Sequence, residues 1–227
     1  MITQGQCLPL FRRNKLFAGL NDATIIECAK QFTLVHACRR QTVYRQGDPC
    51  KQVYCLLQGS VRLSRLAEDG SEFTTGIVGH SDIFGEGALF DDEAFLSTAT
   101  ALSDGIVAVC SAERVRSLVR RYPALSINIA QHFREEQHRA LDRLELLSNK
   151  PVRERLLAVL RELALQCDVG DAQDGKYELK LTHVEVASLV GSTRETVSSE
   201  LSKLVRAGLI AKRGRKIFVD LAAHVAA

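Results

Sequence analysis

The stretch THVEVASLVGSTRETVSSELSKLVRAGLI, from Thr182 to Ile210, decides the fold of the C-terminal part of the chain. Thr182 can cap a helix with its hydroxyl, and Glu185 stands where it completes a capping box. Gly191 then ends this helix, because glycine adopts the left-handed conformation of a helix C-terminus at little cost. Ser192 is the expected N-cap of a second helix. The stretch therefore predicts two short helices joined by a tight turn.

The second of these helices is amphipathic. Val197, Leu201 and Leu204 recur at spacings of three and four residues, which places them on one buried side. Arg194 and Glu195 begin the opposite, polar side. This arrangement is typical of a helix-turn-helix, in which the second helix reads base edges in DNA. An ordinary helical hairpin with a solvated charged face is the alternative at this point.

Length and composition describe an ordinary folded protein. The 227 residues suffice for one large or two modest domains, and 46% of them are hydrophobic and 25% charged. No apolar run approaches the ~18 residues of a membrane span, and the N-terminus lacks a signal-peptide pattern. We therefore expect a cytoplasmic protein with no membrane partner.

Positive charge is concentrated near the C-terminus. The net charge is only +3, and residues 1–149 hold 17 Lys and Arg against 17 Asp and Glu. Between residues 191 and 219 the count is seven against two. A surface that contacts DNA phosphates needs such a local excess.

The seven cysteines contain no C-x-x-C pair and no zinc-like spacing with histidine, so no metal site is predicted. Buried reduced thiols are the plain interpretation, and a redox or iron–sulfur role is the alternative. No Ser/His/Asp or Cys/His constellation stands out, so we predict no catalytic residues and no enzyme. The cysteines are Cys7, Cys28, Cys38, Cys50, Cys55, Cys110 and Cys167.

The N-terminal half changes character after a helical lead-in over residues 1–30. From Thr33 to about Ser111, short alternating apolar runs are separated by turn signals such as Gly47-Asp48-Pro49. Strands at this spacing indicate an antiparallel sandwich or small barrel. The expected strands are 42–44, 53–57, 61–63, 73–78 and 106–109.

A helix over 112–121 ends at Tyr122-Pro123, and a long helix can then run from Pro123 to about Asn149. Six of its residues fall on alternating three- and four-residue steps, as on the seam of a coiled coil with a polar residue at its centre. The seam predicts a homodimer, and a helix packed on its own domain is the alternative. The seam residues are Ala130, Phe133, Gln137, Ala140, Leu144 and Leu147.

Lys150-Pro151 forms a hinge before a helix over 152–166 and a strand over 177–181. After the helix-turn-helix, a basic turn over 211–216 lies between two apolar runs, as in the wing of a winged helix. The predicted fold is α+β, with three parts. They are a lead-in and antiparallel β-roll of the jelly-roll or cupin-like kind (1–111), a dimerisation helix region (112–149) and a winged helix-turn-helix (150–227).

This order of parts resembles the CRP/FNR superfamily of bacterial transcription regulators, from about Phe32 to Asp220. The resemblance implies a homodimer that binds a palindromic DNA operator and contacts RNA polymerase, as an activator or a repressor. The motifs that carry it are Gly47-Asp48-Pro49, Val53-Tyr54 to Gly59-Ser60-Val61, Asp82-Ile83-Phe84-Gly85-Glu86 and Gly191-Ser192-Thr193-Arg194-Glu195-Thr196-Val197.

The same resemblance assigns DNA contacts. It implies a half-site containing T-G-A, in which Arg194 can bond a guanine and Glu195 a cytosine amino group. The implied base contacts are Arg194, Glu195, Ser198 and Ser199. The candidate backbone contacts are Ser192, Thr193, Thr196, Lys203, Lys212, Arg213, Arg215 and Lys216.

The resemblance also places a cyclic-nucleotide cassette at Gly85-Glu86-Gly87, but the sequence departs from the family there. Where the family has an Arg that neutralises the phosphate, this chain reads Glu93-Ala94-Phe95-Leu96-Ser97-Thr98-Ala99, and no Lys or Arg lies between Leu66 and Glu113. A phosphate buried without a cation loses a charge-assisted pair. We therefore expect that cyclic AMP and cyclic GMP do not bind in the usual mode, with binding in an atypical pocket as the alternative.

The effector and any cofactor are left open by the sequence. The possibilities are a thiol switch, an iron–sulfur cluster, haem held by His36, His80, His132 or His138, an anionic metabolite held by Arg134, Arg139 or Arg143, and constitutive control. The candidate effector-pocket residues are Gly85, Glu86, Gly87, Ser97, Thr98, Arg134 and Arg139.

Overall fold

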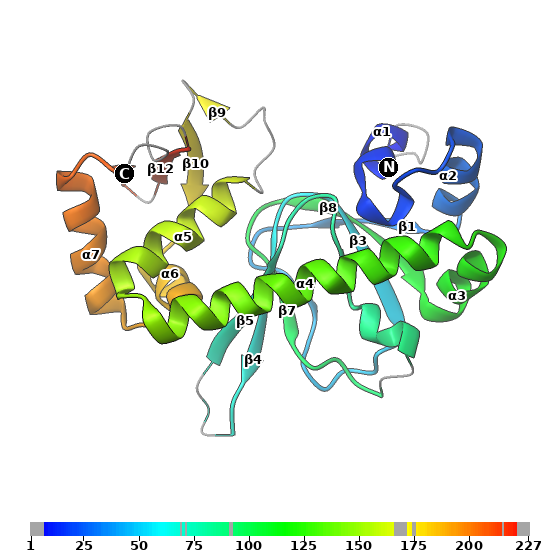
Figure 1. The fold of residues 1–227 in the computed structure, drawn as a ribbon, viewed down its shortest axis with the longest axis horizontal. Coiled ribbons are helices and arrows are strands. Elements are labelled where there is room, and N and C mark those ends of the chain that lie inside the picture. Colours follow the sequence, from blue (N-terminus) through cyan, green and yellow to red (C-terminus); the bar gives the residue numbers. More distant parts are fainter. Residues whose placement is uncertain are drawn as a thin grey trace. The chain divides into compact units, whose positions relative to one another are not determined.

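The computed structural model describes residues 7–68, 70, 72–90, 93–165, 172–173, 176–214 and 216–221. The chain forms two compact units, Met1–Leu66 with Thr75–Arg139 and Ala67–Thr74 with Ala140–Ala227. The boundary between them lies within the long helix α4 (Ala124–Asn149; Figure 1) and not at the Lys150-Pro151 hinge. The expected middle part, 112–149, is thus shared by the two units.

The first unit begins with α1 (Leu8–Arg13), the short 3-10 helix η1 (Lys15–Phe17) and α2 (Asp22–Ala29). Asn21 caps α2, because its side chain accepts a hydrogen bond from Thr24 N at 2.9 Å. Phe11, Phe17 and Phe32 pack edge to face in the buried core of the lead-in.

The β-roll consists of two four-stranded sheets, in which every pairing with a described register is antiparallel. All five predicted strands are present, and the short strands β1, β6 and β7 join them. One sheet has the order β1 (Thr33–Ala37), β8 (Gly105–Ser111), β3 (Gln52–Gln58), β6 (Ile83–Phe84). The other has the order β2 (Thr42–Tyr44), β7 (Thr98–Ala101), β4 (Val61–Leu66), β5 (Glu72–Val78).

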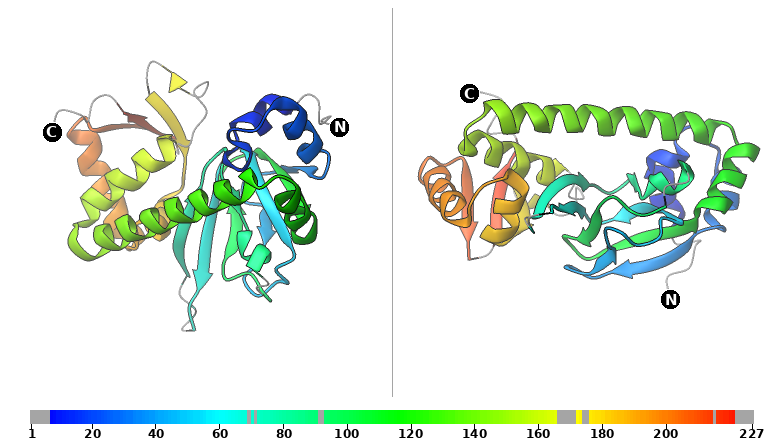
Figure 2. Two further views of the ribbon diagram at one scale, coloured as in Figure 1. Left: turned by 45° about the vertical axis from the view of Figure 1, so that its right-hand side comes forward. Right: turned by 90° about the horizontal axis from the view of Figure 1, so that it is seen from below.

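Helix α3 (Ala112–Arg121) follows the roll, and α4 begins directly after Pro123, as predicted. The N-terminal half of α4 packs along the roll and the lead-in (Figure 2), where Leu125, Ile129 and His132 are buried. Asn128 Nδ2 donates to Leu16 O at 2.8 Å and to Ala18 O at 3.0 Å. These bonds fix the start of α4 against η1. No helix among the described residues is long and apolar enough to cross a membrane.

In the second unit, the helices that follow α4 pack beside a small sheet (Figure 2). The helices α5, α6 and α7 bury Leu156, Leu160, Val186, Leu201 and Leu204 among them. The elements are α5 (Val152–Leu165), α6 (His183–Val190), α7 (Arg194–Arg206), β9 (Ala172–Gln173), β10 (Lys176–Lys180), β11 (Ile210–Arg213) and β12 (Lys216–Asp220), with the sheet order β11-β12-β10-β9.

The turn of the helix-turn-helix forms as the sequence predicts, with one correction. Thr182 and Glu185 form the capping box, and Gly191 has a φ of +60°. The N-cap of α7 is Thr193 and not Ser192, since the Ser192 N–H bonds Ala187 O at 3.1 Å and closes the end of α6. The backbone is extended at the next residue, Thr193, whose Oγ1 accepts a hydrogen bond from Thr196 N at 3.2 Å.

Candidate DNA interface and effector pocket

Helix α7 presents a polar face at its N-terminal end. Val197 is buried, whereas Arg194, Glu195 and Ser199 are exposed. These three side chains are among the four expected base contacts, and they stand on the first two turns of the helix. A reading helix contacts bases from this end.

Ser198, the fourth expected base contact, is half-buried and bonded within the unit. Its Oγ lies 2.5 Å from His183 Nδ1, and His183 Nε2 lies 2.7 Å from Lys212 Nζ. A lysine ammonium only donates, so Nε2 accepts and the Nδ1–H donates to Ser198. Burial, with Lys212 and Arg194 nearby, lowers the pKa of His183, which favours this neutral form. The chain Ser198–His183–Lys212 therefore ties the reading helix to the wing.

The wing carries the expected cations on its exposed side. The Arg213 guanidinium lies 5.9 Å from the centre of the Phe218 ring. Lys216 Nζ pairs with Glu178 Oε2 at 3.0 Å, and on α7 Lys203 Nζ pairs with Glu200 Oε1 at 2.7 Å. A phosphate would compete with these carboxylates for the two lysines. Arg215 lies outside the described residues.

The candidate backbone contacts around the turn differ in their surroundings. Ser192 is half-buried, while Thr193 and Thr196 are exposed and their hydroxyls lie 2.9 Å apart. The turn itself is held from α5, because Arg155 Nη1 donates to Val190 O at 3.0 Å and to Gly191 O at 3.3 Å. Neither Arg155 nor His183 carries a local sequence signal for these contacts, since their partners lie 15 or more residues away.

In the first unit, the described residues enclose a cavity of about 270 Å³ between the roll and α4. The candidates Gly85, Glu86, Gly87 and Ser97 line it, whereas Thr98, Arg134 and Arg139 do not. No Lys or Arg is among its described lining residues. The larger side chains around it are Tyr44, Leu63, Phe90, Phe95, Leu96 and Phe133.

Gly85 shapes the entrance to the 3-10 helix η2 (Glu86–Phe90) beside this cavity. Its φ is +70°, and a Cβ at this position would stand 2.8 Å from Tyr54 Cδ2. Only glycine fits this backbone and this spacing. The glycine therefore has a structural role as well as a place in the pocket wall.

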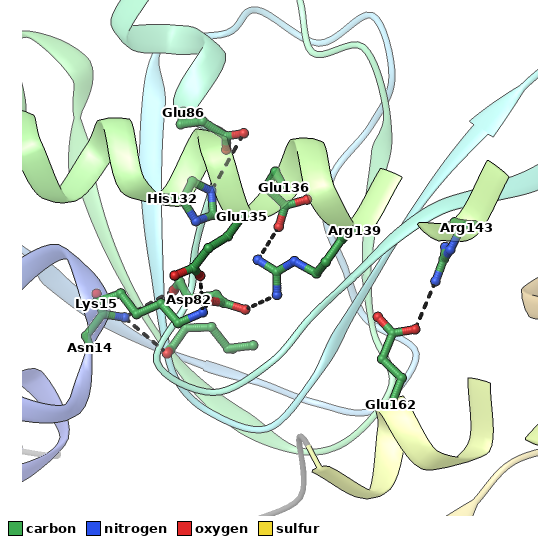
Figure 3. Close-up of polar contacts among 11 residues, drawn as sticks. Asn14, Lys15, Asp82, Glu86, His132, Glu135, Glu136, Arg139, Arg143 and Glu162 are labelled. Atoms are coloured by element: carbon green, nitrogen blue, oxygen red, sulfur yellow. Dashed lines mark hydrogen bonds and ion pairs between the residues drawn. The ribbon is translucent and has the colours of Figure 1, made fainter. Parts of the chain in front are cut away.

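Arg139 lies in a cluster of charges with Asp82, Lys15 and Glu136 (Figure 3), and it is not among the residues that line the cavity. Arg139 Nη1 pairs with Asp82 Oδ2 at 3.0 Å, and Lys15 Nζ lies 2.7 Å from Asp82 Oδ1 and 2.7 Å from Glu135 Oε2. Burial alone would raise the pKa of Asp82, but Lys15 and Arg139 outweigh it and hold that pKa below its usual value. Arg139, a candidate for the effector pocket, thus has its partners in this cluster and does not line the cavity.

The other two arginines considered for an anionic effector also lie away from the cavity lining. Arg134 is exposed on α4, and Arg143 Nη2 pairs with Glu162 Oε2 of α5 at 3.2 Å.

His132 lies between this cluster and Glu86, which lines the cavity (Figure 3). Its Nε2 is 3.9 Å from Glu86 Oε1, and neither ring nitrogen has a hydrogen-bond partner among the described residues. Burial, opposed in part by Asp82, lowers the pKa of His132 to about 4. The ring is therefore neutral near pH 7.

The described cysteines form no disulfide with one another, and all except Cys38 are buried. Burial raises the pKa of Cys28 and of Cys110 to about 11, which keeps both thiols protonated and slow to react. Cys167 lies outside the described residues. Among the residues that the structure describes, no group of three or more His, Cys, Asp or Glu could hold a metal ion.

Five of the six predicted seam residues of α4 are exposed: Ala130, Gln137, Ala140, Leu144 and Leu147. The sixth, Phe133, is half-buried and meets Phe90 edge to face, with 5.3 Å between ring centres. Ile127 and Leu141, which the predicted seam did not include, are 61% and 55% exposed. The exposed apolar face of α4 is thus wider than predicted.

Two family models match the chain. Residues 34–122 match the cyclic nucleotide-binding domain, and residues 154–223 match the Crp-like helix-turn-helix domain. A cyclic nucleotide bound here would need a cation for its phosphate, and the described residues that line the cavity include the Glu86 carboxylate and no Lys or Arg.

Relatives of known function match over most of the chain. The global nitrogen regulator of a Synechocystis species is 32% identical over 80% of this chain and 81% of its own length. A CRP-like cAMP-activated global transcriptional regulator of Mycobacterium tuberculosis is 28% identical over 93% of this chain and 94% of its own. The fold is similar to that of the c-di-GMP responsive regulator CLP of Xanthomonas campestris, with a TM-score of 0.74, 23% identity and coverage of 88% and 99%.

Proposed function

Because the chain belongs to the CRP/FNR family of DNA-binding transcription regulators, we propose that it acts as a homodimer on a palindromic operator. The regulators of this family are not enzymes. The observation that carries the proposal is the exposed first turn of α7, where Arg194 and Glu195 stand beside a basic wing. The exposed apolar face of α4 supports the dimer, since such a face on a long helix is typical of a protein interface.

In this proposal each α7 enters one major groove, and two grooves on one side of DNA lie roughly 34 Å apart. Arg194 bonds the O6 and N7 of a guanine, and Glu195 accepts from a cytosine amino group. Ser198 acts through its bond to His183, which holds the wing lysine Lys212 near the helix. The wing cations and the Thr193 turn contact phosphates. RNA polymerase is the proposed protein partner, in the cytoplasm.

The proposed signal is something other than cyclic AMP. Titration calorimetry with cyclic AMP and cyclic GMP should show no binding in the low micromolar range. The alternative is binding in an atypical pocket, which the cAMP-activated mycobacterial relative favours. Tight binding of either nucleotide would establish this alternative. An absorbance scan of freshly purified protein from 300 to 650 nm tests haem and iron–sulfur cofactors.

Selection from random DNA by gel shift tests the proposed function. The expected product is a palindrome whose half-sites contain T-G-A. Arg194→Ala should yield a palindrome that has lost its preference at one base pair of each half-site. Selection of asymmetric single sites, or no enrichment at all, would contradict the proposal.

A further inference from the structure

The cavity between the roll and α4 has walls of aromatic rings. Tyr44 of β2 stacks on Phe95, with 3.8 Å between ring centres and 15° between their planes. Phe90 of η2 meets Phe133 of α4 across 5.3 Å. All four rings line the cavity, and they come from separate elements of the first unit. A cavity surrounded by ring faces favours a cation or an apolar body.

The charge in these walls is negative. Glu86 lines the cavity, and His132, its neighbour at 3.9 Å, is neutral near pH 7. The sequence has no Lys or Arg from Leu66 to Glu113 and ten Asp and Glu in the same stretch.

Three cations of the first unit, from the lead-in, α3 and α4, have partners outside the cavity lining. Lys15 and Arg139 are paired with Asp82 and with carboxylates of α4. Arg116 Nη1 donates to Ala88 O at 3.1 Å, on η2. The described walls therefore offer an incoming anion no positive partner.

We propose that this cavity binds a small organic cation, a protonated or alkylated amine with one apolar ring or chain. The inference rests on the proposed function, and it takes this cavity as the effector site of the proposed regulator. The ammonium group lies against the ring faces and pairs with the Glu86 carboxylate. A neutral ligand would bring no opposite charge to this carboxylate. An anion would be repelled by it.

The volume limits the size of the ligand. A cavity of about 270 Å³ is slightly smaller than the usual range for ligand pockets, roughly 300–1,000 Å³. It therefore accommodates a ligand with a single ring, and the ammonium group of that ligand determines which ligands bind.

The test uses three probes with the same ring and different charges: benzyltrimethylammonium, benzyl alcohol and phenylacetate. Each is titrated into the full-length protein and followed by NMR of the probe. The ammonium should bind about tenfold or more tightly than either of the others, as expected for a paired and ring-stacked cation. Its N-methyl protons should shift upfield, because they lie over aromatic faces.

Glu86→Gln removes the charge and keeps the shape. It should weaken the ammonium about fivefold or more and leave benzyl alcohol unchanged. Glu72→Gln, an exposed carboxylate on β5, is the matched control and should change nothing. Should Glu86→Gln fail to fold, Phe133→Leu removes one ring and should weaken the ammonium severalfold more than the alcohol.

The inference is overturned if phenylacetate or cyclic AMP binds as tightly as the ammonium, or if the ammonium does not bind at about 10 mM, a level that a fragment of this size should reach. Binding to the selected operator is measured separately by fluorescence anisotropy. Operator binding without ammonium binding rejects this inference and leaves the proposed function standing. Ammonium binding without operator binding rejects the proposed function.

Discussion

At the scale of single residues, His132 couples the stability of the first unit to pH. Burial lowers its pKa to about 4 from an ordinary 6.5, with Asp82 and Glu135 favouring the charged ring and Arg139 and Lys15 opposing it. Between pH 4 and pH 6.5, His132 therefore carries a proton in the unfolded chain and none in the folded chain. The neutral His132 ring therefore makes its full contribution to the free energy of unfolding above pH 6.5. This contribution is lost as the pH falls toward 4, by about 1.4 kcal/mol per pH unit.

His132→Gln should flatten the dependence of unfolding free energy on pH between 6.5 and 4 by about one proton. Urea unfolding at several pH values measures this slope. His138→Gln, on the exposed side of the same helix, is the control and should leave the slope unchanged. An identical slope for wild type and His132→Gln would show that the buried ring does not titrate in this window.

Arg194 should discriminate between bases. Arg194→Ala removes the donor pair for a guanine and should cost about 1–3 kcal/mol on the selected operator, with little loss on random DNA. Arg213→Ala, on the wing, should instead weaken binding to specific and to random DNA alike. It should also reduce the slope of the logarithm of affinity against the logarithm of salt concentration by about one. Fluorescence anisotropy at several salt concentrations measures both variants. Equal losses on both DNAs for Arg194→Ala would contradict its assignment.

The local pattern of the sequence predicts some residue roles and misses others. The exposure of Arg194 and Glu195 follows from the apolar stripe on the opposite side of their helix. The bonds from His183 to Ser198 and Lys212 could not be predicted, because they depend on how α6, α7 and the wing pack. For the same reason the sequence assigned Arg139 to the pocket, although the structure pairs it with Asp82.

At the scale of elements, the C-terminal half of α4 carries apolar side chains that the chain itself leaves exposed. Leu144 is 60% exposed on this face. Leu144→Glu should weaken the dimer about 100-fold or more, because the twofold symmetry places two carboxylates in one apolar interface. Sedimentation equilibrium measures the dissociation constant.

The control for this variant is Leu165→Glu at the end of α5, which makes the same substitution at a leucine that is 68% exposed. It should leave the dimer intact. Loss of the dimer in both variants, or in neither, would place the interface elsewhere.

The sequence predicts well the elements that have a regular spacing of apolar residues or a clear helix start or end. Helix α4 follows from the break at Pro123, and α6 from its capping box. The strands β1, β6 and β7 were not predicted; of these, β6 (Ile83–Phe84) has only two residues, and β7 (Thr98–Ala101) lacks large apolar side chains. Their pairing partners in the roll make them strands, so no local pattern could reveal them.

At the scale of the whole molecule, a dimer that engages two half-sites at once gains affinity from the second contact. The gain can reach about 100-fold or more, and it vanishes when the geometry forbids simultaneous contact. An insertion of about 5 base pairs at the centre of the operator turns one half-site to the opposite face of the DNA. Affinity for this operator should therefore fall to that of a single half-site.

The Leu144→Glu protein separates this geometric loss from damage to the half-sites. As a monomer it should bind the intact, the inserted and the single half-site DNAs with nearly equal affinity at protein concentrations where wild type discriminates among them. Fluorescence anisotropy on the three DNAs gives both sets of values. If wild type binds the inserted operator as tightly as the intact one, the two reading helices do not act together, and the palindrome proposal fails even if Arg194 reads its base.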